Sequence, residues 1–477
     1  MTPSARLAAA IEALGAIGAE AAPPADRVLD RYFRDRRYIG SKDRQAIAER
    51  VFGVLRRRAR LDWHLRESGY RDVLDARRRV LADVIVADGR SMDAIDQLFS
   101  AGPHATGELS RREVELAERL AGRTLDAPEA PPECPFWLAE KLRALYGERF
   151  AEEMSALNRV APFDLRANLL KAKDRGEALQ ALRAEGIEAE PTHLSPLGLR
   201  LPGRKPIEHW TAFRQGQVEV QDEGSQIVAL LVDAKPGMKV VDYCAGAGGK
   251  TLALAAAMNN QGRLVACDTS EGRLERSRVR LKRAGVHNVE THLLAPGDKW
   301  AKRQAAGFDR VLVDAPCSGS GTWRRNPDAR WRYGPDDILG LVEEQKQILD
   351  RAAKLVKPGG RLIYATCALL KEENEDQVSA FLERTPGFAQ MSVAGLWPVA
   401  VGTATPFPAP SPRCAGEGGG GGPDEQSSPS KLQASDNLPP TPALPRAAGG
   451  GDTKALRLSP ALHGTDGFFV AVMEKRA

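Results

Sequence analysis

From Lys239 onward, short apolar segments alternate with longer amphipathic segments, and this alternation constrains the fold more than any other feature of the chain. The short segments have the composition of buried strands, and the long ones have the apolar spacing of helices. The expected strands are KVVDYC, RLVACD, NVETHLL, FDRVLVDAP and GRLIYATC, and helices such as GGKTLALAAAM, SEGRLERSRVRLKRAG and DDILGLVEEQKQILDRAAKLV separate most of them. This order predicts an α/β fold with a doubly wound, mostly parallel sheet. The late segment GFFVAVMEK is expected to be an edge strand of that sheet.

Two smaller regions precede the predicted sheet domain, which spans 236–477. Residues 1–130 contain RVLDRYFRDRR and QAIAERVFGVLRRRARLDWHL, whose apolar residues recur at the three-and-four spacing of amphipathic helices. The proline-rich stretch DAPEAPPECP then resembles a linker. Residues 136–235 place a helix-like GEALQALRAEG between strand-like FDLRANLL and LGLRLPG, which predicts a small α+β module. The chain of 477 residues is therefore expected to form three folded parts.

The composition changes sharply between Thr403 and Asp452. This stretch has one aromatic residue, Phe407, and an unbroken run of glycines at 418–422. A segment of this kind cannot bury enough apolar surface to offset the entropy lost on ordering. Since GFFVAVMEK still needs strand partners after it, we expect 403–452 to be a disordered insertion within the sheet domain.

The composition excludes several classes of protein. No apolar run approaches the ~20 residues of a membrane span, and the N-terminus lacks the layout of a signal peptide. The six cysteines form no CxxC pair, which argues against a zinc site or a disulfide framework; they are Cys134, Cys244, Cys267, Cys317, Cys367 and Cys414. We therefore expect a cytoplasmic protein with neither a metal nor a membrane partner.

The net charge of +5 is mild, but the basic residues are concentrated. Residues 27–60 hold twelve Lys or Arg and four Asp or Glu. A local excess of this kind attracts phosphate backbones. Solvated helix faces also carry charge runs, so at this point both interpretations remain open.

A glycine-rich turn follows the first predicted strand of the sheet domain. It reads Cys244-Ala245-Gly246-Ala247-Gly248-Gly249-Lys250 and then enters a helix, a place where backbone N–H groups approach a ligand closely. A phosphate-binding P-loop needs glycine where Cys244 stands, and a dinucleotide fingerprint needs glycine at Thr251. The remaining interpretations are an S-adenosylmethionine loop and a purely structural turn.

Asp268 ends the second predicted strand. An acidic side chain there can accept hydrogen bonds from both ribose hydroxyls of a nucleoside cofactor. This position supports NAD and S-adenosylmethionine equally. A helix cap or a surface acid is the alternative, and the neighbouring glycine-rich turn makes it less favoured.

Two cysteines and an aspartate follow later strands. Asp314-Ala315-Pro316-Cys317 ends one strand and Thr366-Cys367 ends the next. Because ligand sites in doubly wound sheets lie beyond the carboxyl ends of the strands, these side chains should converge beside the glycine-rich turn. A single strand cysteine is usually inert core material, whereas two at adjacent functional ends favour chemistry.

Two thiols, a carboxylate and a methyl donor suit methylation of cytosine at C5. C5 is a poor nucleophile until a thiolate adds to C6 and makes the ring enamine-like, which is covalent catalysis. An acid must then stabilise the charge that develops at N3, and a second acid/base group must assist loss of the C5 proton and of the thiol.

These motifs resemble a known family. DYCAGAGGKT, DAPCSGSGTWRRNPDARW, YATCALLKEENE, GTDGFF and the upstream VEVQDEGSQ are similar to the Sun/RsmB family of RNA 5-methylcytosine methyltransferases. The helical N-terminal region resembles the NusB-like RNA-binding domain of many bacterial members. The resemblance covers most of the chain apart from 403–452, and it implies a Rossmann-like class I methyltransferase domain.

The resemblance also implies roles for the site residues. Cys367 would be the nucleophile, Cys317 would assist product release, and Asp314 would contact cytosine and cofactor. Residues 244–250 and Asp268 would bind S-adenosylmethionine, and Lys250 would lie near the substrate. Ribosomal RNA would be the partner of a monomeric enzyme, and the basic residues beside its phosphates would be Arg324, Arg325 and Arg330.

The chain departs from the family pattern at three places. Gly246-Ala247 replaces Ala-Pro in the turn, and Ala368 stands where serine often follows the nucleophile. The third strand ends near Leu294 instead of at an acidic residue, with Asp298 four residues later. Either Asp298 substitutes, or adenine is held without that contact.

Other functions remain open from the sequence. An inactive RNA-binding assembly factor would need neither Cys317 nor Cys367, and an ATPase is disfavoured by Cys244. A DNA cytosine methyltransferase would use Cys317 as its nucleophile, and transfer RNA is an alternative substrate for the same chemistry.

Overall fold

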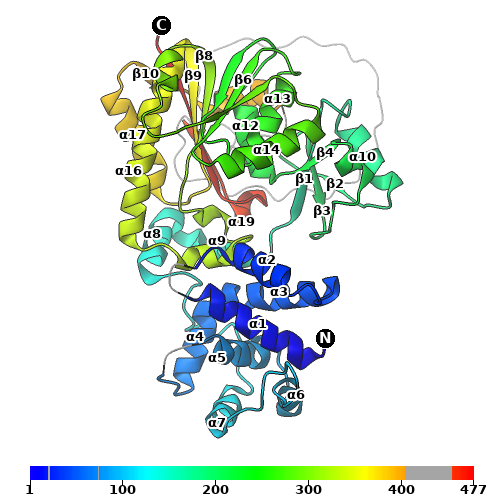
Figure 1. Ribbon diagram of the computed structural model, residues 1–477. Helices are drawn as coiled ribbons and strands as arrows, with labels where there is room; N and C mark the ends of the chain where they lie inside the picture. Colours follow the sequence, from blue (N-terminus) through cyan, green and yellow to red (C-terminus); the bar gives the residue numbers. More distant parts are fainter. Residues whose placement is uncertain (20–21, 73–74, 403–453) are drawn as a thin grey trace, which may run out of the picture.

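The computed structural model describes residues 1–19, 22–72, 75–402 and 454–477 (Figure 1). The predicted insertion at 403–452, Phe407 and Cys414 lie outside the described residues. Figure 1 shows a helical part at the N-terminus and a larger α/β part that contains the C-terminus.

The N-terminal part is all-helical, as expected, and its buried apolar side chains form a core of their own. Its helices are α1 (Pro3–Ile17), α2 (Ala25–Asp35), α3 (Ser41–Arg56), α4 (Arg58–Glu67), α5 (Ala76–Ala82), the π-helical η1 (Asp83–Ala87), α6 (Met92–Leu98) and α7 (Arg111–Leu120). The helix expected over 45–65 is broken at Arg57. The Glu133 carboxylate accepts the N–H groups of Ala59 (2.8 Å) and Arg60 (3.2 Å), which replaces the helical partners lost at the start of α4.

The region expected as the α+β module, 136–235, contains a small sheet and helices on either side of it. The module itself is a four-stranded antiparallel sheet in the order β2-β3-β1-β4. Its elements are β1 (Phe163–Ala167), α10 (Arg175–Ala184), β2 (Glu190–Pro191), β3 (Gly198–Leu201), α11 (Thr211–Arg214) and β4 (Val218–Val220). Before it, α8 (Phe136–Tyr146), η2 (Gly147–Arg149) and α9 (Phe150–Asn158) pack against the sheet domain, and after it α12 (Glu223–Leu231) does the same. The apolar side chains of α8, α9 and α12 pack against residues of the sheet domain. The sequence pattern shows that these helices are amphipathic, but it does not show which core they contact.

The sheet domain is a doubly wound α/β fold, as predicted. Its strands are β5 (Lys239–Asp242), β6 (Arg263–Asp268), β7 (Val289–Leu293), β8 (Phe308–Asp314), β9 (Val356–Thr366), β10 (Phe388–Gln390), β11 (Ala455–Leu458) and β12 (Phe468–Lys475), in the order β10-β12-β9-β8-β5-β6-β7 with β11 also paired to β12. The run from β9 to β7 is parallel.

Helices cover both faces of this sheet. α12, α13 (Gly249–Ala257) and α18 (Val393–Ala400) pack on one face, and α14 (Glu271–Ala284) packs against α13. α15 (Trp300–Arg303), α16 (Pro335–Ala352) and α17 (Glu375–Arg384) cover the other. Short turns complete the domain: η3 (Ser320–Thr322), η4 (Pro327–Trp331), η5 (Ala353–Leu355), η6 (Lys371–Glu373) and α19 (Pro460–His463).

The expectation that GFFVAVMEK forms an edge strand is wrong. β12 lies inside the sheet, antiparallel to β9 on one side and to β10 and β11 on the other. The run FFVAVM is buried at every position, as a strand covered on both faces requires. The short β10, which has only three residues, gave no comparable signal in the sequence.

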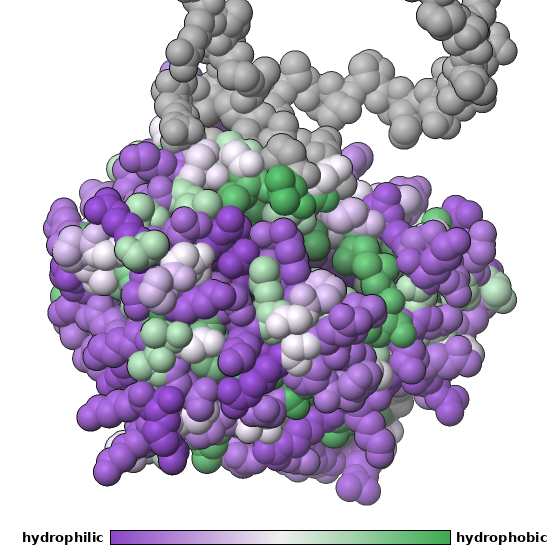
Figure 2. Space-filling model, turned by 90° about the horizontal axis from the view of Figure 1, so that it is seen from above, coloured by the Kyte–Doolittle hydropathy of each residue, from purple (hydrophilic) through white to green (hydrophobic). Residues whose placement is uncertain are grey.

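The exterior is largely polar. Figure 2 shows a mostly hydrophilic face with small, separate apolar patches. Among the described residues, no helix combines the length and the apolar character that crossing a membrane would require.

One buried hydrogen bond joins β5 to α13, the helix that follows the glycine-rich turn. Asp242 ends β5 and is 1% exposed. Its Oδ2 accepts the hydroxyl of Thr251 in α13 at 2.7 Å, whereas its Oδ1 is buried without a partner. Burial raises the pKa of Asp242 to about 7, since a carboxylate is poorly stabilised there.

We expect Asp242→Asn to change how stability depends on pH. Native Asp242 keeps its proton up to about pH 7, whereas the unfolded chain loses it near pH ~4. Between these values the native state binds more protons, so wild-type stability falls as pH rises, by about 1.4 kcal/mol per pH unit. The variant lacks this loss and still accepts the Thr251 hydroxyl. The urea-unfolding midpoint of the wild type should therefore fall relative to that of the variant as the pH rises from 5 to about 7. Midpoints that change in parallel from pH 5 to 8 would contradict the raised pKa of Asp242.

Candidate active site

The two cysteines meet at the carboxyl ends of neighbouring strands. Cys317 follows β8 and Cys367 follows β9, and their sulfur atoms are 3.4 Å apart. Both side chains are partly exposed, whereas Cys134 and Cys267 are buried. The predicted convergence of the two thiols is therefore present in the geometry.

Two adjacent side chains fix the loops that carry these thiols. Glu373 accepts both the N–H (2.8 Å) and the hydroxyl (2.6 Å) of Ser318. Asn374 accepts the hydroxyl of Thr366 at 2.5 Å and donates to the carbonyl of Ala368 at 2.9 Å. Sequence reasoning missed both residues as positioning groups, although the motif YATCALLKEENE contains them. Two polar residues inside an otherwise buried turn were the available signal.

A glycine pair closes the same loops from the C-terminal side. Gly321 donates its N–H to the carbonyl of Cys367 at 2.8 Å and accepts the N–H of Gly467 at 2.9 Å. A Cβ atom on Gly321 would lie 2.2 Å from the carbonyl oxygen of Gly467. Only glycine allows this approach, which brings the GTDGFF motif against the cysteine loops.

Lys250 and Asp314 form an ion pair beside the thiols. Lys250 Nζ lies 2.7 Å from Asp314 Oδ2 and 5.6 Å from the centre of the Phe468 ring. Burial alone would lower the pKa of Lys250, but the negative charges of Asp314 and Cys367 raise it above its usual value. The ammonium group is therefore retained, and it lies close enough to interact with a Cys367 thiolate.

The thiol of Cys317 holds its proton firmly. The hydrogen bond to Cys367, together with burial, raises the pKa of Cys317 well above its usual value. Cys244, in the glycine-rich turn, also has a raised pKa because it is buried, so it remains a neutral thiol.

The glycine-rich turn has the conformation and the space that a bound ligand requires. Gly246 and Gly248 have φ of +56° and +81°, in the region that favours glycine. A Cβ on Gly248 would lie 2.9 Å from Ser277, whereas a Cβ on Gly246 would meet no atom within 4 Å. Helix α13 begins at Gly249 without a side-chain cap, so its first N–H groups suit the carboxylate of S-adenosylmethionine.

Asp268 is placed at this turn but already has partners. One oxygen accepts the N–H of Gly246 at 2.9 Å and the other accepts the N–H of Ser270 at 2.8 Å. Each carboxylate oxygen can accept a further hydrogen bond, so the side chain fits a ribose while it supports the loop.

Asp298 was expected as a possible replacement for the acidic residue that is missing at the end of β7, but its carboxylate is hydrogen-bonded to other groups. Asp298 bonds to His292 Nε2 at 2.5 Å and to the N–H of Trp300 at 2.8 Å. Leu294 packs on the apolar cluster beneath β6. The structure thus gives Asp298 a local role and leaves an apolar side chain at the end of β7. In the described part of the chain, no group of three or more His, Cys, Asp and Glu could hold a metal ion.

The expectation that Arg324, Arg325 and Arg330 line RNA phosphates is wrong for the two buried ones. Arg324 is 5% exposed and pairs with Asp466 at 3.0 Å, and Arg330 is 2% exposed and donates to the carbonyl of Glu133 at 2.8 Å. Arg325 is less buried but binds Asp466 (2.6 Å) and Asp222 (2.8 Å). Charge in the sequence could not reveal acidic partners more than 100 residues away.

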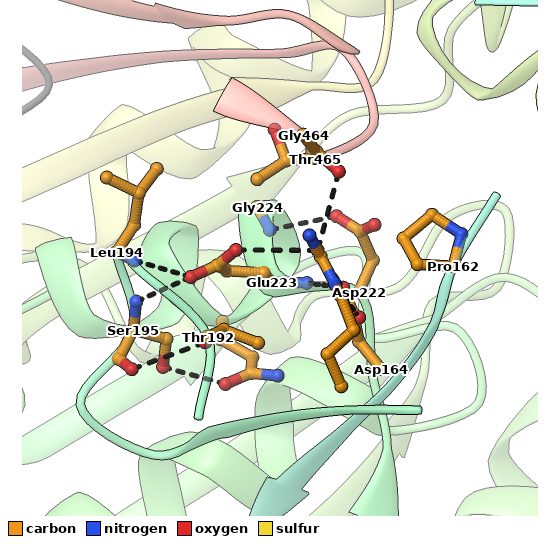
Figure 3. Close-up of polar contacts among 12 residues, drawn as sticks. Pro162, Asp164, Thr192, Leu194, Ser195, Asp222, Glu223, Gly224, Gly464 and Thr465 are labelled. Atoms are coloured by element: carbon orange, nitrogen blue, oxygen red, sulfur yellow. Dashed lines mark hydrogen bonds and ion pairs between the residues drawn. The ribbon is translucent and has the colours of Figure 1, made fainter. Parts of the chain in front are cut away.

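A second buried network joins the module to the sheet domain (Figure 3). Arg200 binds Asp164 through two hydrogen bonds of 2.7 and 2.8 Å. Glu223 accepts the N–H groups of Leu194 (2.5 Å) and Ser195 (2.9 Å). Asp222, next to Glu223, accepts the N–H of Asp466 at 3.3 Å. The motif VEVQDEGSQ therefore anchors the module to the segment that also positions the cysteine loops.

About half of the Lys and Arg side chains at 27–60 form ion pairs or hydrogen bonds with other groups of the protein. Arg50 and Arg57 bind the fully buried Asp83, and Arg56 donates to the carbonyl of Arg324 at 2.6 Å, across to the sheet domain. The cations of the run that are exposed and make no ion pair with a described residue are Arg27, Arg31, Arg34, Arg37 and Lys42.

Comparisons with known proteins agree with this geometry. The family described as 16S rRNA methyltransferase RsmB/F matches residues 229–403, and the ferredoxin-like domain of RsmF/B-like methyltransferases matches 134–208. The ribosomal RNA small subunit methyltransferase B of Photorhabdus laumondii is 32% identical over 366 residues, which are 72% of this chain and 83% of that protein. A probable counterpart in Synechocystis is 33% identical over 384 residues, 75% of this chain and 84% of that protein.

Solved structures of other proteins have a similar fold. The crystal structure of PH0851 superposes with a TM-score of 0.73 at 26% identity, covering 100% of this chain and 99% of that one. A methyltransferase homologue from Pyrococcus horikoshii gives 0.53 at 27% identity, covering 71% and 94%. Fold, motifs and relatives together show that the chain belongs to the RsmB/F (Sun) family of ribosomal RNA methyltransferases, with the class I Rossmann-like fold.

Proposed function

We propose that this protein transfers a methyl group from S-adenosylmethionine to C5 of a cytosine in small-subunit ribosomal RNA, through a covalent bond between Cys367 and C6. The observation that carries the proposal is the contact of 3.4 Å between the Cys317 and Cys367 sulfurs, beside the Lys250–Asp314 ion pair. A binding module would need neither thiol. The names of the relatives supply the RNA, since they are small subunit ribosomal RNA methyltransferases.

The first step is attack of the Cys367 thiolate on C6. Cys317 lies within hydrogen-bond distance of the attacking sulfur, and the Lys250 ammonium stabilises the thiolate. As the S–C6 bond forms, negative charge moves into the ring. Asp314 Oδ2 is bonded to Lys250, which leaves Oδ1 to accept a hydrogen bond from the 4-amino group of the cytosine. The Lys250 ammonium beside it offsets the charge that develops at N3.

S-adenosylmethionine, when bound, supplies the methyl group as an electrophile. We assign its methionine end to residues 244–250 and its ribose to Asp268. With Leu294 at the end of β7 and Asp298 bonded to His292, we assign an apolar wall to the adenine. C5 would take this methyl group as the sulfur–methyl bond breaks, and the electron pair of that bond would leave with S-adenosylhomocysteine.

Release requires that C5 lose its proton and that the S–C6 bond break. The hydrogen bond to Cys367 is the largest cause of the high pKa of Cys317. Once Cys367 is bonded to carbon, this cause is gone, so Cys317 releases its proton to solvent more readily, and the resulting thiolate can accept the C5 proton. Loss of that proton restores the aromatic ring and expels the Cys367 thiolate.

The helical domain, 1–130, is proposed to hold the RNA near this site. Its exposed cations on α2 and in the turn to α3 suit a phosphate backbone, and the Arg56 contact fixes the domain to the loop after Cys317. The target base must leave its stack, because the thiol has to reach the face of the ring.

Single cysteine variants should separate the two roles. Cys367→Ala should lower methyl transfer on the order of 10³-fold or more and form no adduct, because the nucleophile is gone. Cys317→Ala should lower turnover about 10²-fold or more while a protein–RNA adduct accumulates. Methyl incorporation and denaturing gels measure both effects.

Cys134→Ala is the matched control, because Cys134 is buried away from the pair. Its activity should equal that of the wild type. If Cys317→Ala abolishes the adduct and Cys367→Ala traps it, the roles are reversed.

Bisulfite sequencing of ribosomal and transfer RNA tests the substrate. RNA from cells with and without the gene should differ at one 5-methylcytosine in the small-subunit ribosomal RNA. Reintroducing the wild type should restore that site, and reintroducing Cys367→Ala should not. A site lost from transfer RNA, or no lost site, would contradict the proposal.

A further inference from the structure

The α+β module lies against α14 (Figure 1), and three arginines and one glutamate come together at this junction. Arg280 and Arg283 of α14 bind Glu219 of β4 at 3.2 and 2.5 Å. Arg166 lies directly opposite Glu219 in the pairing of β1 with β4. Three cations against one anion leave two positive charges without a partner.

Arg166 is the most unusual member of this cluster. It is 2% exposed, and no hydrogen bond or ion pair joins its side chain to another residue in the described ranges. Its Nε is buried without a partner, and so is the Nε of Arg283. Burial, and to a lesser extent Arg280, lower the pKa of Arg166 to about 10, so it is still charged at neutral pH. Glu219 offsets part of this effect, but it is shared with Arg280 and Arg283, so the cluster keeps excess positive charge. Excess buried charge is destabilising, which points to an anion from outside the chain.

The cluster continues along the surface of α14. Arg276, Arg280 and Arg283 have the spacing that places side chains on one side of a helix, about 5.4 Å apart per turn. Arg276 is exposed and makes no ion pair within the described part of the molecule. A row of cations one turn apart suits an anion with repeated charges.

The cluster also touches the back of the cofactor turn. Arg280 donates to the carbonyl of Ala247 at 2.7 Å. A carboxylate of the cofactor would instead bind N–H groups at the start of α13. Two members of the cluster, Arg166 and Glu219, come from the module and not from the methyltransferase domain. Both observations favour an anion other than the cofactor.

We infer that Arg280 and Arg283 bind a backbone phosphate of the RNA substrate, that the buried Arg166 behind them strengthens the site through its charge, and that Arg276 lies beside the next phosphate along the strand. The inference rests on the proposed function for the identity of the polymer. It gives the α+β module a direct part in RNA binding, at its junction with α14. Guanidinium–phosphate pairs at Arg280 and Arg283 would then offset the excess positive charge of the cluster.

Arg166→Gln in the full-length protein tests the inference. The dissociation constant for a fragment of 16S ribosomal RNA, measured by fluorescence anisotropy, should rise about tenfold, and the slope of its logarithm against log salt should fall by about 1. Binding of S-adenosylmethionine, measured by calorimetry, should not change. The melting temperature should stay equal or rise, because the variant removes an unpaired buried charge.

Two further variants serve as controls. Arg166→Lys keeps the charge and should retain part of the salt dependence. Lys346→Gln removes one charge from a side chain on α16 that is 46% exposed, and it should leave RNA affinity unchanged.

Three results would overturn the inference. RNA affinity and salt slope could equal those of the wild type. Affinity for S-adenosylmethionine could fall while RNA affinity holds, which would assign the cluster to the cofactor carboxylate. The melting temperature could fall together with both affinities, which would make Arg166 purely structural. Since binding is measured without methyl transfer, a chain that binds this RNA but never methylates it would refute the proposed function and leave the phosphate site standing.

Discussion

The contact between the Cys317 and Cys367 sulfurs is the constraint on which the rest of the site depends. Two thiols come within 3.4 Å only because β8 and β9 are parallel neighbours and both cysteine loops are held from behind. Glu373 and Asn374 hold them through side chains, and the Gly321–Gly467 approach holds them through backbone. Since each of these contacts is buried or sterically demanding, small changes there should alter the sulfur geometry before they alter the fold.

Buried charge performs two different tasks in this protein. Around Arg200, Arg324 and Arg325, guanidinium groups meet carboxylates from distant parts of the chain, so the α+β module, the loop after Cys317 and the GTDG turn form one unit. Around Arg166 the carboxylates are too few, and positive charge remains. The first arrangement stabilises the architecture. The second lowers stability unless an anion binds, which is the usual relation between a functional site and the fold that carries it.

The sequence predicted the strand–helix order, the cofactor turn and the two cysteine loops because periodicity, glycines at strand ends and short motifs are local signals. The sequence did not predict the features that depend on contacts between residues far apart in the chain. The place of β12 within the sheet depends on the three-residue β10, and the burial of Arg324 and Arg330 depends on Asp466 and Glu133. The packing of α8, α9 and α12 on the sheet domain was not predictable for the same reason: they look like any amphipathic helices until the core they contact is known.

The central claim is that Cys367 attacks the cytosine while Cys317 keeps its proton. The most direct measurement is peptide mapping by mass spectrometry of the wild-type protein trapped on small-subunit ribosomal RNA that contains 5-fluorocytidine, whose fluorine cannot leave as the C5 proton does. We predict that the nucleotide is attached to the peptide that contains Cys367 and that Cys317 is unmodified. Attachment to Cys317, or a stable complex with no covalent bond, would contradict the account.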